Sequence, residues 1–123
     1  MKIINDTDFM YSEWACGEQS IRLLHPNKGY AVYSEKKNVV VSMEYGTGNH
    51  LDATVYDLAG NMIGKIHPST EDVFYQYISQ HPNSVSGIAI VGAFDKVVDN
   101  FQDWFFEIDL DRFCVGKRIS PAY

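Results

Sequence analysis

Acidic side chains recur at every second position near the C-terminal end of the chain, an arrangement in which carboxylates can do chemistry. Glu107, Asp109 and Asp111 alternate with apolar residues. Clustered carboxylates can ligate Ca²⁺, and a pair of them can cleave a glycosidic bond. On one strand face, however, successive carboxylates would stand about 7 Å apart, and no EF-hand spacing accompanies them. We therefore expect exposed acids, with neither a calcium site nor a glycosidase centre.

The segment 103–111 predicts a strand with two unlike faces, because strand side chains alternate with a period of two. One set is apolar and is expected in the core: Trp104, Phe106, Ile108 and Leu110. The other set surrounds one phenylalanine with four carboxylates: Asp103, Phe105, Glu107, Asp109 and Asp111.

Two further acids precede this strand, so that residues 95–111 hold six acids against Lys96 alone, a local charge of −5. The commoner interpretation of such a segment is a solvated outer face whose charges discourage edge pairing. The other is a docking surface for a basic partner, with the phenylalanine as its aromatic anchor. The candidate partner-binding residues are Asp95, Asp99, Asp103, Phe105, Glu107, Asp109 and Asp111.

The histidines do not form a metal-site pattern. Three of them, His25, His67 and His81, directly precede prolines, and His50 follows a glycine-rich turn. No pair has the i,i+4 helix spacing or the clustering with cysteine that zinc sites show. A residue before proline is driven toward extended backbone, so His-Pro is typical of turns. We expect no metal and no cofactor.

The sequence contains no motif that indicates nucleophilic catalysis. There is no G-x-S-x-G and no glycine loop suited to a phosphate. The two cysteines, Cys16 and Cys114, are too few for a secreted disulfide framework, although a single bridge stays open. We expect two structural thiols and a chain that is not an enzyme.

Composition favours one acidic domain over residues 1–123. The net charge of −6 opposes binding to nucleic acid and would steer a basic partner toward the protein. No apolar run is long enough for a transmembrane helix, and residues 1–15 lack the apolar stretch of a signal peptide. We therefore expect a cytoplasmic protein that does not interact with membranes.

Glycine, proline and asparagine at short intervals predict a strand meander. The expected strands lie at 20–25, 29–33, 38–45, 51–56, 62–66, 87–94, 103–111 and 113–119, with a turn at 46–49. Residues 6–15 fit either a helix or an extended segment, and 95–100 fit a loop or one helical turn.

One helix is expected over 69–81. Ser69 or Thr70 can cap it, and Val73/Tyr77 and Phe74/Ile78 have i,i+4 spacing. The sequence thus predicts a β-dominated α+β fold, an antiparallel meander of seven to eight strands with one or two short helices. An all-β sandwich or barrel is the alternative.

Two resemblances bear on function. Residues 55–63, V-Y-D-L-A-G-N-M-I, look like one unit of the Tyr-Asp repeats of large bacterial toxin-delivery proteins. The size, acidity, Tyr/Asp-rich meander and D-W-F-F-E-I-D-L segment at 103–110 resemble bacterial immunity proteins of contact-dependent and other polymorphic toxin systems. This resemblance implies a non-catalytic protein that binds one toxin domain, often a nuclease, and blocks its active site. The group shares no motif, so it assigns no site residue here.

Two functions follow as expectations. The first is a non-catalytic acidic binding protein, an immunity protein that occludes a basic toxin domain through the 95–111 surface. The alternative is a small-ligand-binding or enzymatic domain whose pocket is assembled from residues distant in sequence. Its candidate lining is aromatic and imidazole: Tyr30, Tyr33, Tyr45, Tyr56 and His50.

Overall fold

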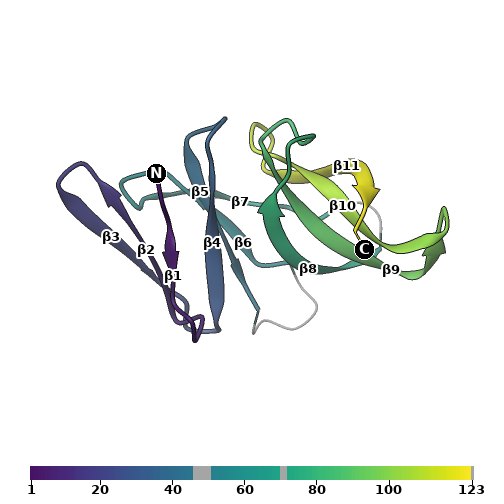
Figure 1. Cartoon of the computed structure of the whole chain (residues 1–123), viewed down its shortest axis with the longest axis horizontal. Helices are drawn as coiled ribbons and strands as arrows, with labels where there is room; N and C mark the ends of the chain where they lie inside the picture. The colour runs from purple at the N-terminus through teal and green to yellow at the C-terminus, as the bar shows by residue number, and fades with distance from the viewer. Residues whose placement is uncertain (46–50, 70–71, 123) are drawn as a thin grey trace.

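A computed structural model describes residues 1–45, 51–69 and 72–122. Within these residues the chain forms eleven strands in three antiparallel sheets, with no helix (Figure 1). The expected α+β class is therefore wrong, and the all-β alternative fits better. The predicted turn at 46–49, together with His50, Thr70 and Glu71, lies outside the described residues.

The sheets follow one another along the chain. The N-terminal sheet holds β1 (Ile4–Asn5), β2 (Tyr11–Cys16) and β3 (Gln19–Leu24) in that order. The central sheet holds β4 (Gly29–Ser34), β5 (Val39–Glu44), β6 (Ala53–Tyr56) and β7 (Met62–Lys65) in that order. The C-terminal sheet holds β8 (Val73–Gln80), β9 (Ile88–Val98), β10 (Phe101–Asp109) and β11 (Cys114–Pro121), with β8 and β11 at its edges.

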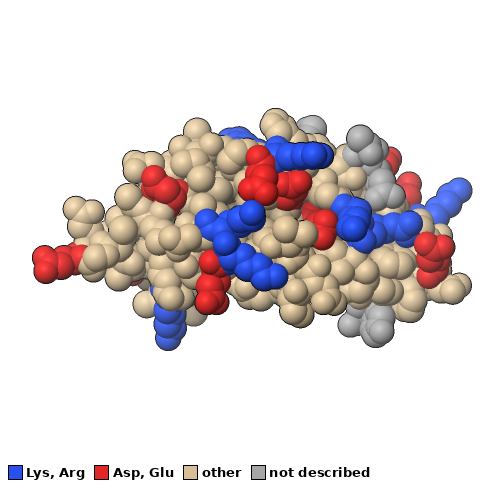
Figure 2. Space-filling view, turned by 90° about the horizontal axis from the view of Figure 1, so that it is seen from above, with Lys and Arg blue, Asp and Glu red and all other residues tan. Residues whose placement is uncertain are grey.

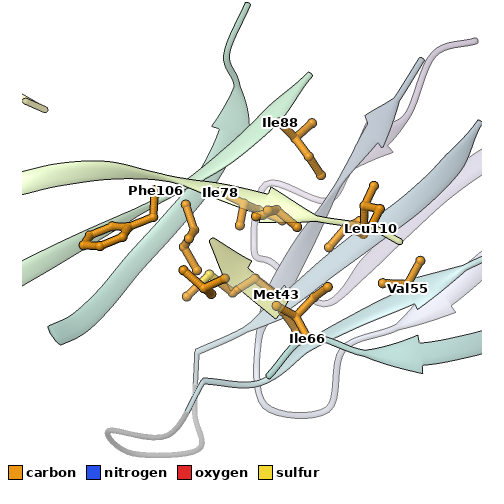
Figure 3. Close-up of a cluster of buried hydrophobic side chains, with 12 residues drawn as sticks. Met43, Val55, Ile66, Ile78, Ile88, Phe106 and Leu110 are labelled. Atoms are coloured by element: carbon orange, nitrogen blue, oxygen red, sulfur yellow. The ribbon is translucent and has the colours of Figure 1, made fainter. Parts of the chain in front are cut away.

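The central sheet is covered on both faces, because side chains of alternate residues project to opposite sides of a strand. On one side Val40 and Ala31 pack with Trp14 of β2. On the other side Val41 and Met43 join the larger cluster of buried residues that the C-terminal sheet contributes. Figure 3 shows this larger cluster, in which Met43, Val55 and Ile66 lie near Ile78, Ile88, Phe106 and Leu110.

The predicted helix at 69–81 is replaced by β8. Aromatic and β-branched residues dominate this stretch and fit a half-buried pleated surface: Val73, Phe74, Tyr75, Tyr77 and Ile78. A bulge between Tyr75 and Tyr77 shifts the register against β9. The core-packed residues Val73, Tyr75 and Ile78 are therefore spaced by two and then three positions. A strand interrupted in this way imitates helical spacing.

Neither ambiguous segment contains a helix: 6–15 is a turn followed by a strand, and 95–100 is the end of a strand followed by a turn. Residues 11–16 form β2, whose Trp14 is 3% exposed. β9 continues through Val98 and turns at Asp99 and Asn100, which have φ of 48° and 73°. Two consecutive residues with positive φ make the type I′ turn that suits a tight hairpin, and asparagine and aspartate tolerate that conformation.

Hydrogen bonds join the central and C-terminal sheets at both edges of the central sheet. His67, after β7, donates its N–H to the Phe113 carbonyl at 2.8 Å and accepts from the Val115 N–H at 2.9 Å. On the opposite side, the Tyr30 hydroxyl of β4 donates to the Ile78 carbonyl and accepts from the Ile78 N–H, both at 2.5 Å. Burial raises the pKa of Tyr30 above its usual value, and nearby Tyr45 adds to the rise, so this hydroxyl stays a donor.

Tyr30→Phe is expected to lower the free energy of unfolding by about 1–3 kcal/mol, because it leaves both backbone groups of Ile78 without their partner. Tyr33→Phe is the matched control. Its hydroxyl donates to the Asn38 side chain at an exposed position, and its loss should cost less than about 1 kcal/mol. Urea denaturation of the two variants measures the difference, and equal losses would contradict the role given to Tyr30.

Candidate functional site

The C-terminal sheet has one face turned away from the large core, and the carboxylates of Asp103 and Glu107 lie on it. Phe106 and Ile108, at 0% and 1% exposure, are buried in the core as expected, so their neighbours in β10 project outward. Residues paired across strands share a face. On the outward face, three rows of paired residues run across the strands. They are Phe74, Ala93 and Asp103; Tyr77, Val91, Phe105 and Ser120; and Ser79, Ala89 and Glu107.

This face is curled. His81, directly after β8, lies 4.7 Å from the Phe105 ring, and its Nε2 is 3.3 Å from the Ser120 hydroxyl of β11. In a flat sheet β8 and β11 would be roughly 14 Å apart. Ala89 and Val91 on this face are 0% and 1% exposed although neither belongs to the large core cluster, as the curl of the sheet explains. Phe105 is accordingly half-buried beneath His81.

The open part of this face contains a hollow of about 400 Å³. Asp72 and Asp95 both line it, beside Phe74 of β8 and Ala93 of β9. Phe74 is 51% exposed, so a large apolar ring stands at the surface next to two carboxylates. We call Asp72, Phe74, Tyr77, Asp95, Asp103, Phe105 and Glu107 the acidic face.

The predicted acids differ in how they are held. Asp99 pairs with Arg118 at 3.1 Å, and Asp111 pairs with Lys37 at 3.2 Å. Asp109 accepts the N–H groups of Asp111 and Arg112, each at 2.9 Å, and so closes the turn after β10. These three carboxylates are engaged within the protein. By contrast, no ion pair of the described residues includes Asp72, Asp95, Asp103 or Glu107.

Figure 2 shows the view from above, toward the end that carries the β4–β5 and β10–β11 turns in Figure 1. Lys and Arg side chains lie beside Asp and Glu side chains along this surface. The Lys37–Asp111 pair joins the two turns there. The surface at this end is therefore mixed in sign. Glu107 of the acidic face lines a small pocket here together with Lys37 and Asp111.

Asp72, Phe74 and Tyr77 were not among the candidates from sequence, because a helix over 69–81 would not place them beside β9. The available signal was the strand propensity of V-F-Y-Q-Y-I at 73–78. Of the predicted residues, the structure brings Asp95, Asp103, Phe105 and Glu107 to one face. It places Asp99 and Asp111 in ion pairs near opposite ends of β10.

The tyrosines proposed to line a pocket do not converge. Tyr33 and Tyr56 pack beside the Trp14 cluster. Tyr30 packs against the other cluster and stacks on Tyr45 at 5.7 Å. They therefore project from opposite faces of the central sheet.

A serine, a histidine and a carboxylate do meet between the N-terminal and central sheets. Ser12 Oγ is 2.7 Å from His25 Nε2, and His25 Nδ1 is 3.1 Å from Glu44 Oε1. A hydrolytic triad needs a reachable serine that gives its proton to the histidine. Ser12 is fully buried and donates to Asn5 Oδ1 instead. This arrangement therefore does not present a nucleophile.

Other kinds of site find little support. The described residues contain no group of three or more His, Cys, Asp or Glu side chains that could hold a metal ion. Cys16 and Cys114 are both free thiols. In the described ranges, no helix is long and apolar enough to span a membrane. No family model, curated protein or solved structure matches the chain.

Proposed function

We propose that this chain is a non-catalytic, cytoplasmic binding protein that occludes a basic protein partner with its acidic face, and that the partner is a bacterial toxin domain. The observation that carries the proposal is the set of four carboxylates without an ion-pair partner, Asp72, Asp95, Asp103 and Glu107, placed around exposed or half-exposed aromatic rings.

The two kinds of side chain would contribute differently. The carboxylates would attract a basic surface over distance and raise the association rate, an effect that salt weakens. Phe74 is 51% and Tyr77 is 40% exposed, so both rings retain area that a partner can bury. Aromatic residues of this kind dominate the binding energy of many interfaces. The same negative field opposes nucleic acid.

A pull-down from source-cell lysate tests this proposal, with the tagged chain as bait at low and at high salt. We expect one stoichiometric basic protein at low salt and a reduced yield at high salt. Expression of that protein alone should be toxic, and co-expression of the chain should relieve the toxicity. Recovery of no protein at either salt concentration, or of a partner whose binding is indifferent to salt, would overturn the proposal.

A further inference from the structure

The outer edge of β3, in the N-terminal sheet, presents backbone groups that β2 does not use. β3 pairs with β2 in an unbroken register over its whole length, and beyond it the His25 N–H donates to the Met10 carbonyl at 2.7 Å. Hydrogen-bonded pairs alternate along an antiparallel ladder, so the odd-numbered residues of β3 direct their backbone groups toward β2. The even-numbered residues direct theirs away from it: Ser20, Arg22 and Leu24.

This edge lies at one end of the molecule, on the left in Figure 1. Within the described ranges, no backbone hydrogen bond joins β3 to a strand other than β2. The side chains of Ser20, Arg22 and Leu24 are all exposed. The N–H and carbonyl groups of these residues can therefore accept a further strand without displacing any part of the described chain.

Other sheet edges of this chain carry features that hinder strand addition. At the edge of β4, the Asn5 side chain accepts the Ala31 N–H at 2.9 Å and donates to the Ala31 carbonyl at 3.0 Å. At the edge of β8, the Tyr30 hydroxyl takes up both backbone groups of Ile78. The register of β7 against β6 shifts once, and that of β11 against β10 shifts twice. Such caps and bulges are usual protections of an exposed edge.

β3 lacks these protections. Its six residues contain no proline and no lysine, and its register has no bulge. Its one charged side chain is held over its own sheet: Arg22 Nε donates to Glu13 Oε1 at 2.5 Å, and the guanidinium carbon lies 4.1 Å from the centre of the Tyr11 ring. Glu13 and Tyr11 both belong to β2, so the guanidinium is drawn away from the open edge and leaves it accessible.

We propose that β3 pairs antiparallel with β3 of a second copy of this chain, joining two N-terminal sheets into one continuous sheet. Antiparallel pairing of identical strands gives the two-fold symmetry of most homodimers. An axis at Ile21 places Ser20 of each copy opposite Arg22 of the other, and each such pair exchanges two backbone hydrogen bonds. An axis at Arg22 would instead set two arginines directly opposite each other, which is unfavourable.

The register centred on Ile21 is also complementary in charge. Glu18 is exposed in the β2–β3 turn and forms no ion pair within the described residues. In this register it lies diagonally across from Arg22 of the second copy. Diagonal neighbours are about 7–8 Å apart, within reach of long side chains. On the other face of the joined sheet, the two half-buried Ile21 side chains meet at the axis and bury each other.

The contact is small, since each copy contributes one strand of six residues. A stable interface buries about 800 Å² on each partner, more than one strand edge offers. The dimer is therefore weak and reversible, and it forms only at high protein concentration. At the dilution of a binding assay the chain is a monomer, so this contact is independent of the acidic face and of the function proposed for it.

Sedimentation velocity and amide hydrogen exchange of the unmodified chain test the proposal, from about 10 μM to about 1 mM, because a contact of this size gives a weak dimer. We expect the mean mass to rise toward twice that of the chain. The amides of Ser20 and Arg22 should exchange several-fold more slowly at the high concentration. Those of Ile21 and Leu23, which already bond to β2, provide the internal control and should not change.

Ser20→Pro should abolish the dimer, because it removes an outward N–H while the ladder to β2 stays intact. Proline is tolerated at a strand edge in this position, and continued protection of the Ile21 amide checks that the ladder persists. Ala15→Pro is the matched control. Ala15 pairs with Ser20 across the ladder but lies on β2, and its N–H faces the opposite edge of the sheet. This variant should dimerise as the unmodified chain does.

Three results would each overturn the proposal. They are a chain that stays monomeric over the whole range, a dimer in which the Ser20 and Arg22 amides exchange as in the monomer, and a Ser20→Pro variant that dimerises like Ala15→Pro. Protection of these two amides only after the recovered partner protein is added would also overturn it, since a strand of that protein would then occupy the edge in place of a second copy.

Discussion

Phe106→Ala is expected to lower the free energy of unfolding by about 3–5 kcal/mol, the usual cost of removing a fully buried phenylalanine. Phe106 is 0% exposed, and its ring lies 5.9 Å from that of Phe94. Gly92 packs so closely that a Cβ there would be 3.1 Å from the Phe106 ring. Neighbouring residues are therefore unable to fill the cavity that the missing ring would leave. Urea denaturation measures the decrease in the free energy of unfolding.

The adjacent Phe105 provides the control, because it has the same side chain on the opposite face of β10. It is half-buried against His81. Phe105→Ala should therefore cost about 1–2 kcal/mol, since only part of its ring area leaves water on folding. Equal losses for the two variants, or a reversed order, would contradict the assignment of the two faces of β10.

Much of the strand meander could be predicted from the sequence, because alternation survives wherever one strand face is buried. β4, β5, β7 and β10 lie close to their expected ranges. β8 could not be predicted as a strand, because its bulge interrupts the alternation of buried and exposed residues and leaves spacings that a helix also gives. The error then propagated to the site, since Asp72, Phe74 and Tyr77 join the acidic face only if residues 73–80 are a strand.

The sequence also could not show which of the acidic side chains form ion pairs within the protein. Asp99 and Asp111 look the same as Asp95 and Asp103 in the chain, but their cations come from distant segments. Arg118 lies in β11 and Lys37 in the β4–β5 turn. Likewise, Ser12 and Glu44 meet through His25 although the three residues lie in separate segments of the chain. Spacing along one strand cannot show such contacts, because they depend on how the sheets pack.

Charge reversal on the acidic face is expected to weaken partner binding by at least about tenfold at low salt. Asp95→Lys with Asp103→Lys is the informative pair, because neither carboxylate has an ion-pair partner in the described part of the chain. Asp109 is unsuitable, since it closes the turn after β10. Most of the loss should be in the association rate and should shrink at high salt, as biosensor kinetics with the recovered partner can measure.

The matched control is Asp8→Lys with Glu18→Lys, which makes the same change in net charge at two exposed positions before and after β2. If binding depends only on net charge, the two double variants will bind alike. If it depends on the acidic face, the control will bind much as the unmodified protein does. Equal weakening of both would contradict the proposed surface.

The most direct measurement is an NMR titration of the ¹⁵N-labelled chain with the recovered partner. The account predicts that amide signals along the rows of the acidic face change, among them Phe74, Ala93, Asp103 and Phe105, while those of the N-terminal sheet stay in place. Changes confined to the N-terminal sheet or to the β4–β5 turn would show that the partner binds elsewhere. The acidic face would then be a solvated surface and not a binding site.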